Sequence, residues 1–67
     1  MLVGDLIYND NFDCDCNYDI YDCTENEAKL IFSTKRDGVE KPLDKILDMK
    51  ISHISIENST IVIEAIH

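Results

Sequence analysis

Residues 50–66 read KISHISIENSTIVIEAI, and this stretch predicts a β-hairpin. Two runs rich in β-branched residues, 50–57 and 60–66, flank the dipeptide Asn58-Ser59. Asparagine tolerates a positive φ, so a two-residue turn at this dipeptide can join two strands without strain. We therefore expect the two runs to pair as antiparallel strands.

The register of this hairpin follows from the position of the turn. The expected cross-strand pairs are Glu57–Thr60, Ile56–Ile61, Ser55–Val62, Ile54–Ile63 and His53–Glu64. A shift by one residue would mix the isoleucine pairs with the polar set, so the pattern defines the register. The last strand is apolar on both faces, because Val62 and Ile66 point away from Ile61 and Ile63. We therefore expect this strand either to be central in a sheet, with both faces covered, or to meet a second copy of the chain through its second face.

An earlier strand is predicted by strict alternation within residues 12–23. The even positions hold Phe12, Cys14, Cys16, Tyr18 and Ile20, and the odd positions hold Asp13, Asp15, Asn17, Asp19 and Tyr21. A period of two indicates one buried face and one acidic, solvated face. Residues 28–34, AKLIFST, predict the next strand, antiparallel to this one, with Leu30 and Phe32 on one face.

A helix of about two turns is predicted at about 42–49, within KPLDKILDM. Pro42 suits the first helical position, where its missing N–H costs nothing. The spacing of Leu43, Ile46 and Leu47 gives an apolar stripe. Because so short a helix is unstable alone, we expect it to pack on the sheet. Just before it, the sequence predicts a turn with Gly38 at positive φ.

Together these elements predict one small α+β domain spanning residues 1–67. We expect a curled, mostly antiparallel sheet of four or five strands, with the one short helix preceding the C-terminal hairpin. Residues 1–11 are expected to add a short strand or one helical turn that begins at Asp5. A chain of this length buries only about 60% of its unfolded surface, and self-association would add to it. A homodimer or higher oligomer is therefore expected.

The net charge of -8 is distributed unevenly. Residues 1–27 contain eight acidic residues and no lysine or arginine, and all six basic residues lie within 29–50. Such a field repels polyanions, so we expect no direct binding of nucleic acid. The same field would attract a basic surface on another protein, although acidity also keeps a small isoleucine-rich domain in solution.

The candidate protein-binding residues lie on the acidic face of the strand at 12–23: Asp13, Asp15, Asp19 and Tyr21. The carboxylates would meet a basic partner, and exposed tyrosine is enriched at interfaces. The same acids resemble a calcium loop. However, a loop that starts at Asp13 or Asp15 lacks glycine at its sixth position and glutamate at its twelfth.

A zinc site is the alternative interpretation of Cys14, Cys16, Cys23 and His53. Structural zinc sites separate paired cysteines by two to four residues, whereas one residue separates Cys14 from Cys16. Both of these cysteines share the predicted buried face, where cysteine packs as a small hydrophobic side chain. We therefore expect no metal and no other cofactor, and keep the Cys/His site as the alternative.

No catalytic motif is present in the sequence. Gly4 and Gly38 are the only glycines, so a phosphate-binding loop cannot be built, and the common nucleophile motifs are absent. His53 opposite Glu64 has no candidate nucleophile beside it. Residues 1–20 lack the pattern of a signal peptide, and no apolar run reaches the ~20 residues of a membrane span. We expect a non-enzymatic, cytoplasmic protein with reduced thiols and no membrane association.

A proline-led helix that ends in Leu-Asp and is followed by a hairpin is formed by Pro42, Leu43, Ile46-Leu47-Asp48, Ile51, Ile54-Ser55-Ile56-Glu57 and Ile61-Val62-Ile63-Glu64. In this arrangement the chain from about Gly38 onward resembles a class of small uncharacterised proteins from phages, prophages and gut bacteria. Some similar small acidic phage proteins inhibit host defence systems, including anti-CRISPR proteins. The resemblance implies a protein-binding inhibitor that engages a basic surface of a host protein. An oligomeric assembly protein and a Cys/His metal-binding protein are the alternatives.

Overall fold

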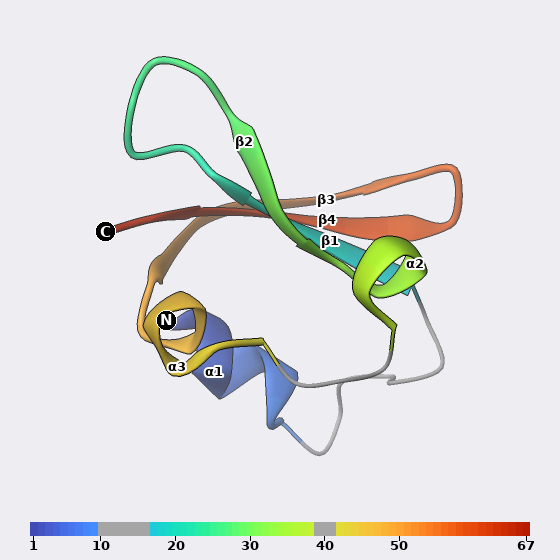
Figure 1. Ribbon diagram of the computed structural model, residues 1–67, viewed down its shortest axis with the longest axis horizontal. Helices are drawn as coiled ribbons and strands as arrows, with labels where there is room; N and C mark the ends of the chain where they lie inside the picture. Colours follow the sequence, from blue (N-terminus) through green and yellow to red (C-terminus); the bar gives the residue numbers. More distant parts are fainter. Residues whose placement is uncertain (10–16, 39–41) are drawn as a thin grey trace.

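The computed structural model describes residues 1–9, 17–38 and 42–67 (Figure 1). In chain order the elements are α1 (Val3–Ile7), β1 (Asn17–Asp22), β2 (Lys29–Ser33), α2 (Thr34–Asp37), α3 (Asp44–Leu47), β3 (Lys50–Glu57) and β4 (Thr60–Ile66). The strands form one four-stranded sheet in the order β2-β1-β4-β3. β1 and β4 pair in parallel at its centre, and the two outer pairs are antiparallel. The predicted α+β class with a mostly antiparallel sheet is confirmed, with three short helices in the described part of the chain instead of one.

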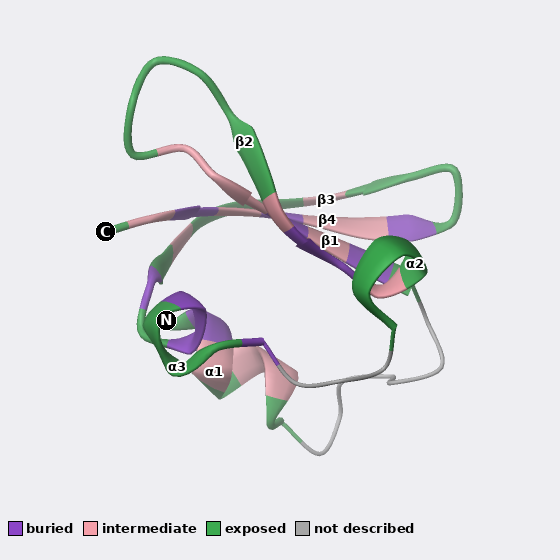
Figure 2. Cartoon of the chain, viewed as in Figure 1, coloured by how far each residue is buried: buried purple, intermediate pink, exposed green. Residues whose placement is uncertain are grey.

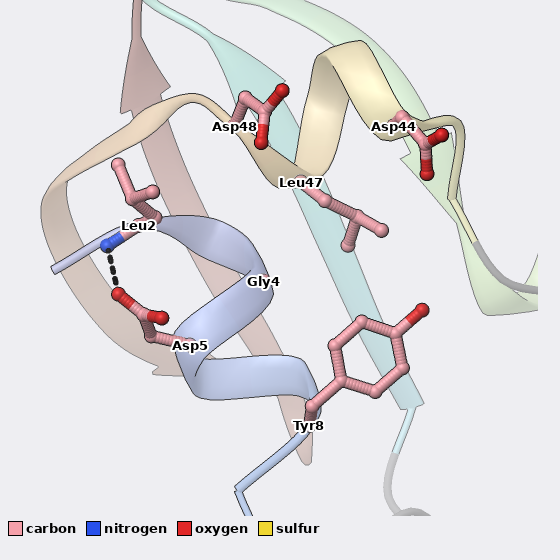
Figure 3. Close-up of a pocket in the computed structure, with 7 residues that line it drawn as sticks. All are labelled: Leu2, Gly4, Asp5, Tyr8, Asp44, Leu47 and Asp48. Atoms are coloured by element: carbon pink, nitrogen blue, oxygen red, sulfur yellow. Dashed lines mark hydrogen bonds between the residues drawn. The ribbon is translucent and has the colours of Figure 1, made fainter.

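Helices α1 and α3 lie together on one face of the sheet (Figure 1). Val3 N–H donates a hydrogen bond to the carbonyl oxygen of Met49 at 2.8 Å, which connects α1 to the segment that follows α3. A Cβ added at Gly4 would lie 3.1 Å from the carbonyl oxygen of Leu47, so glycine allows the two helices to approach closely (Figure 3).

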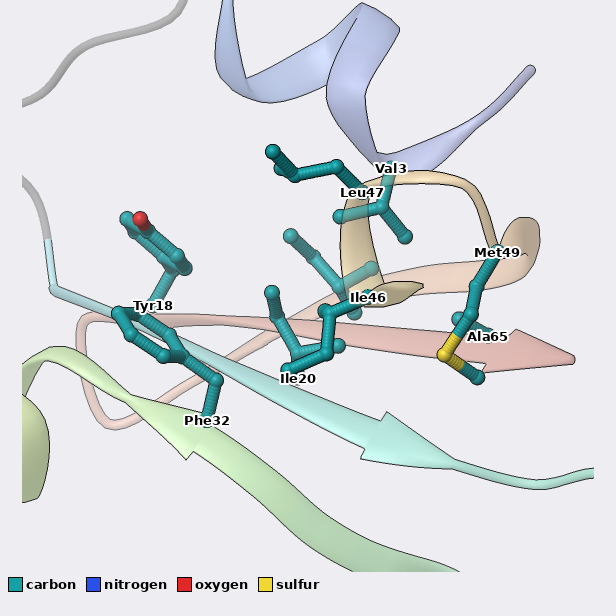
Figure 4. Packing of buried hydrophobic residues seen from close by; sticks show 9 residues of the cluster. Val3, Tyr18, Ile20, Phe32, Ile46, Leu47, Met49 and Ala65 are labelled. Atoms are coloured by element: carbon teal, nitrogen blue, oxygen red, sulfur yellow. The ribbon is translucent and has the colours of Figure 1, made fainter. Parts of the chain in front are cut away.

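The hydrophobic core fills the space between this helical layer and the sheet (Figures 2 and 4). Its buried members are Val3, Tyr18, Ile20, Phe32, Ile46, Leu47, Met49, Ile63 and Ala65. Ile20 in β1 and Ile63 in β4 are fully buried neighbours in the central parallel pair. The core is therefore centred on the two strands that the chain brings together from its first and last thirds.

The hairpin of β3 and β4 has the pairs obtained by counting back from its turn, from Glu57–Thr60 to His53–Glu64. Asn58 and Ser59 both have positive φ, at 50° and 64°, as a two-residue turn of this kind requires. The register shifts between Ile51 and His53, where a bulge interrupts the ladder. β4 is a central strand, as one of the two expectations requires, with Ile61, Ile63 and Ala65 facing the helices and Val62 and Ile66 on the opposite face.

The predicted alternation describes only part of β1 and β2. Tyr18 and Ile20 are buried on one face as expected, whereas Phe12 lies outside the described residues. Leu30 and Phe32 do not share a face: Phe32 pairs with Ile20, but Leu30 pairs with the next residue of β1. A bulge in this pair adds one residue to β2 and reverses the alternation. As a result, Phe32 is buried and Leu30 is 38% exposed.

Helix α3 is shorter than the predicted helix at 42–49. Leu43 has an extended backbone and precedes the helix as its N-cap, so Pro42 lies outside the first turn. The side chain of Leu43 is consequently exposed and does not join the apolar stripe, whereas Ile46 and Leu47 are buried as predicted. Met49, just after the helix, is buried in its place.

The two remaining helices are single turns. Of the two expectations for residues 1–11, a short helix is observed within residues 1–9, but it begins at Val3 and not at Asp5. Asp5 lies inside the helix, and its Oδ2 accepts a hydrogen bond from Leu2 N–H at 3.1 Å. Helix α2 occupies the segment expected to turn before Gly38. Gly38 ends it with a φ of 81°, as predicted.

Candidate functional site

The face of the sheet opposite α1 and α3 is covered by neither helix (Figure 1). We call it the open face, and the observed registers place on it the side chains of Asn17, Asp19, Tyr21, Leu30, Ser33, Lys50, His53, Ser55, Glu57, Thr60, Val62, Glu64 and Ile66. Two rows cross it from β2 to β3. One row is Ser33, Asp19, Val62 and Ser55, and the next is Leu30, Tyr21, Glu64 and His53.

Tyr21 lies between Leu30 and Glu64 in the second row. Its side chain is half-buried, as are those of Val62 and Ile66. Acidic side chains alternate with these apolar ones, since Asp19 neighbours Val62. The open face therefore combines apolar contact area with carboxylates, a composition suited to binding a partner that presents both basic and apolar groups.

Asp19 is linked to the junction of β2 and α2. Its Oδ1 accepts a hydrogen bond from Ser33 Oγ at 2.7 Å. The N–H of Ser33, a buried residue, donates to Asp37 Oδ2 at 3.0 Å. Asp37 in turn accepts a 2.8 Å hydrogen bond from Arg36 Nη2. Asp19 is thus a half-buried, hydrogen-bonded carboxylate and not the freely solvated side chain that the alternation predicts.

Arg36 adds positive charge beside this part of the open face. The hydrogen bond to Asp37 is the main reason that the pKa of Arg36 is raised, and the charges of Asp37 and Asp19 contribute further. Arg36 is distant from the acidic strand in sequence, but α2 places it near Asp19 in the fold. The open face is therefore less uniformly negative than the composition of residues 1–27 indicates.

The pKa of Asp37 lies below its ordinary value of 3.8 because of hydrogen bonds from Arg36 and from Ser33 N–H. A carboxyl with a lower pKa in the folded chain stabilises it above the unfolded pKa, and this stabilisation is lost as the pH falls through the folded pKa. Asp37→Asn should therefore lower the free energy of unfolding at neutral pH. In urea titrations, this loss should shrink below about pH 3.8.

A suitable control for this prediction is Glu27→Gln, which removes one negative charge from an exposed turn. It should change the free energy of unfolding less than Asp37→Asn does at neutral pH. A loss at Asp37→Asn that stays constant from neutral to acid pH would show that the carboxylate is not the stabilising form.

The four sequence-predicted binding residues are only partly placed. Asp19 and Tyr21 lie on the same face, as expected, but Asp13 and Asp15 fall outside the described residues. Of the alternative zinc ligands, Cys14 and Cys16 also fall outside them. Cys23 follows the end of β1, and His53 is exposed on the open face.

The surroundings of Cys23 disfavour the free thiolate. Burial raises the pKa of its thiol, and the negative charges of Glu64 and Asp22 raise it further. Because the thiolate is the nucleophilic form, this environment does not activate Cys23 for nucleophilic attack. Within residues 1–9, 17–38 and 42–67, no group of three or more His, Cys, Asp and Glu side chains is arranged to hold a metal ion.

The ends of β1 and β4 are joined by hydrogen bonds around Asp22. Its Oδ1 accepts from Thr24 N–H at 2.9 Å, and its Oδ2 lies 3.3 Å from His67 Nε2. The pKa of Asp22 is lowered, chiefly by its hydrogen bonds with Thr24. His67 N–H donates to Thr24 Oγ1 at 2.9 Å, so this cluster anchors the end of the last strand.

A hollow between α1 and α3 was not anticipated from the sequence (Figure 3). Its volume is about 660 Å³, and it is lined by Leu2, Gly4, Asp5, Tyr8, Asp44, Leu47 and Asp48. The i, i+4 spacing of Asp44 and Asp48 was a signal that these carboxylates lie on one side of a helical turn. The position of Asp5 in the same hollow as Asp44 and Asp48 was not predictable, because it depends on the packing of α1 against α3.

No protein-family model, no curated protein and no solved structure matches this chain. None of the helices in the described part of the chain has the length and apolar character needed to span a bilayer.

Proposed function

We propose that this protein is a non-catalytic protein-binding module that engages a basic surface of its partner through the open face. The observation that supports this most is the row of Leu30, Tyr21 and Glu64 beside Asp19 and Val62, which no described helix covers. The carboxylates and the net charge of -8 would speed encounter with a basic partner. Tyr21 would supply a rigid aromatic contact in the middle of the interface.

The particular form of this function that we propose is inhibition of a host protein by a phage or prophage product. The resemblance of the chain from Gly38 onward to small phage and prophage proteins supports it. The acidic residues on the sheet would compete with a polyanion for the same basic surface of the host protein, because the sheet and the polyanion both present regularly spaced negative charge.

The test is a pull-down from a lysate of the source organism with the purified chain as bait. The lysate is treated with nuclease, and the beads are washed at low salt and at about 0.5 M salt. We expect a basic protein, retained at low salt and released at high salt, because screening weakens attraction between exposed charges. Recovery of the chain alone, with no partner retained at low salt, would contradict the proposal.

Two variants and two controls test whether the open face is the binding surface. Tyr21→Ala and Asp19→Asn should each weaken the complex about tenfold or more, and asparagine keeps an acceptor for Ser33. Tyr8→Ala and Asp44→Asn make the same chemical changes at the hollow between α1 and α3 and should leave affinity nearly unchanged. Equal losses from both pairs would indicate general acidity and not a defined face.

A further inference from the structure

The two edges of the sheet differ in how they are protected. β2 has five residues and a bulge, and a one-turn helix follows it directly. β3 has eight residues, and its bulge lies near its N-terminal end, between Ile51 and His53. The outer edge of β3 is covered at its N-terminal end by residues 1–2. Leu2 pairs with Lys50, and Ile51 N–H donates to the carbonyl oxygen of Met1 at 2.9 Å. Beyond this point, no described segment pairs with the outer edge of residues 52–57.

The position of the turn decides which backbone N–H and C=O groups point outward from this free edge. In a two-residue hairpin the residues next to the turn, here Glu57 and Thr60, exchange hydrogen bonds with each other. Alternate residues point the opposite way, so the N–H and C=O groups of Ile54 and Ile56 face outward. A regular, unpaired edge of this kind is a template for another strand, and natural proteins usually block it with proline, lysine or a bulge. Residues 53–57 contain none of the three.

The side chains on the same edge are also exposed. Ile54 and Ile56 lie on the helical side of the sheet, yet they are 43% and 73% exposed. Ile56 is the most exposed large apolar side chain in the described residues. On the open face, the same segment presents His53 and Glu57, an imidazole and a carboxylate that can hydrogen-bond to each other.

We propose that two copies of the chain pair through β3, antiparallel about a two-fold axis at Ser55, and so join their sheets into one of eight strands. In this register Ile54 of one copy faces Ile56 of the other, and both present outward backbone groups that exchange hydrogen bonds. On the opposite side, His53 of each copy faces Glu57 of the other. Each contact occurs twice, as a two-fold interface requires.

The neighbouring registers are less complementary. Moving the axis to Ile54 would place Ile56 opposite Ser52, and moving it to Ile56 would place Ile54 opposite Asn58. Both would also separate His53 from Glu57. Among these three axes, only the one at Ser55 matches outward backbone groups, apolar pairs and polar pairs at once, and this self-complementarity identifies a second copy of the chain as the occupant.

The first test is sedimentation equilibrium of the native chain and of Ile56→Lys. We expect the native chain to dimerise at about 0.1 mM, and the variant to dissociate at least about tenfold more readily. Leu43→Lys is the matched control, because Leu43 is 63% exposed and lies away from β3. It should leave dimerisation unchanged. Raising the salt should not dissociate the dimer, since both copies are acidic, and this separates it from the salt-sensitive complex proposed above.

The second test is disulfide trapping. Ser55 would face its own copy in a pair that exchanges no hydrogen bonds, with Cα atoms about 4.5 Å apart, which is within the range for a disulfide. Ser55→Cys should therefore cross-link under mild oxidation, and the linked peptide can be identified by mass spectrometry apart from the native cysteines. His53→Cys is the control, because it would face Glu57.

Three results would overturn the proposal. The first is a native chain that stays monomeric at about 1 mM. The second is a dimer that Ile56→Lys does not weaken. The third is cross-linking of Ser55→Cys no faster than that of His53→Cys, which would place the interface or its register elsewhere.

Discussion

Ile63→Ala should lower the free energy of unfolding by about 2–5 kcal/mol, which is most of the stability available to a domain of this size. Ile63 is fully buried in β4, between Ile20 of β1 and Ile54 of β3. Truncation would leave a cavity at the centre of the sheet, where neighbouring strands are held by their own pairing and cannot close it. Urea titration followed by circular dichroism measures the loss, and we expect the unfolding midpoint of the variant to move close to zero urea at 25 °C.

Ile56→Ala is the control for this prediction. It removes the same atoms from a strand of the same hairpin, but Ile56 is 73% exposed. We expect a change below about 1 kcal/mol at low protein concentration, where self-association does not contribute. Similar losses from both variants would mean that Ile63 is not the centre of the core.

Phe32→Ala should lower the free energy of unfolding by about 3–5 kcal/mol. Phe32 is 6% exposed and stacks on Tyr18, with ring centroids 5.7 Å apart and an interplanar angle of 26°. The substitution would remove the aromatic pair together with a large share of the apolar contact at this end of the sheet. The same urea titration measures the effect.

Leu30→Ala tests the bulge in β2 as well as the core. Simple alternation would place Leu30 and Phe32 on one buried face and predict comparable losses. The bulge turns Leu30 to the open face, where it is 38% exposed, so its truncation should cost much less than that of Phe32. A loss as large as that of Phe32→Ala would contradict the observed register.

The hairpin was predictable because its information is local. Asn58-Ser59 defines the turn, and the isoleucines on either side define the register without reference to the rest of the chain. The burial of Tyr18 and Ile20 was predictable for the same reason, since their alternation extends over several residues.

The errors arise where a non-local contact decides the local geometry. Alternation cannot reveal the bulge that separates Leu30 from Phe32. Leu43 matches a helical stripe, yet the backbone there is extended. In the candidate site, the alternation correctly placed Asp19 and Tyr21 on the same face of the strand. The approach of Arg36 through Ser33 and Asp37 was not, because it depends on how α2 follows β2.

The strand order was not predictable either. Nothing in the composition of β1 and β4 selects parallel pairing between them, because the alternation of β1 and the apolar residues on both faces of β4 fit either strand direction. Their pairing in turn decides which face is open and which strand becomes the free edge. The two surfaces to which we assign binding and self-association therefore both depend on this one contact.

The parallel pairing of β1 with β4 also has a kinetic consequence. Each hairpin can form from neighbouring residues, but β1 can pair with β4 only when the connection between the two hairpins, residues 34–49, allows them to meet. Closure of long loops is slow, and its entropic cost grows only with the logarithm of length. We expect docking of the two preformed hairpins to limit the folding rate. Lengthening the turn at 24–27 should then leave the rate almost unchanged.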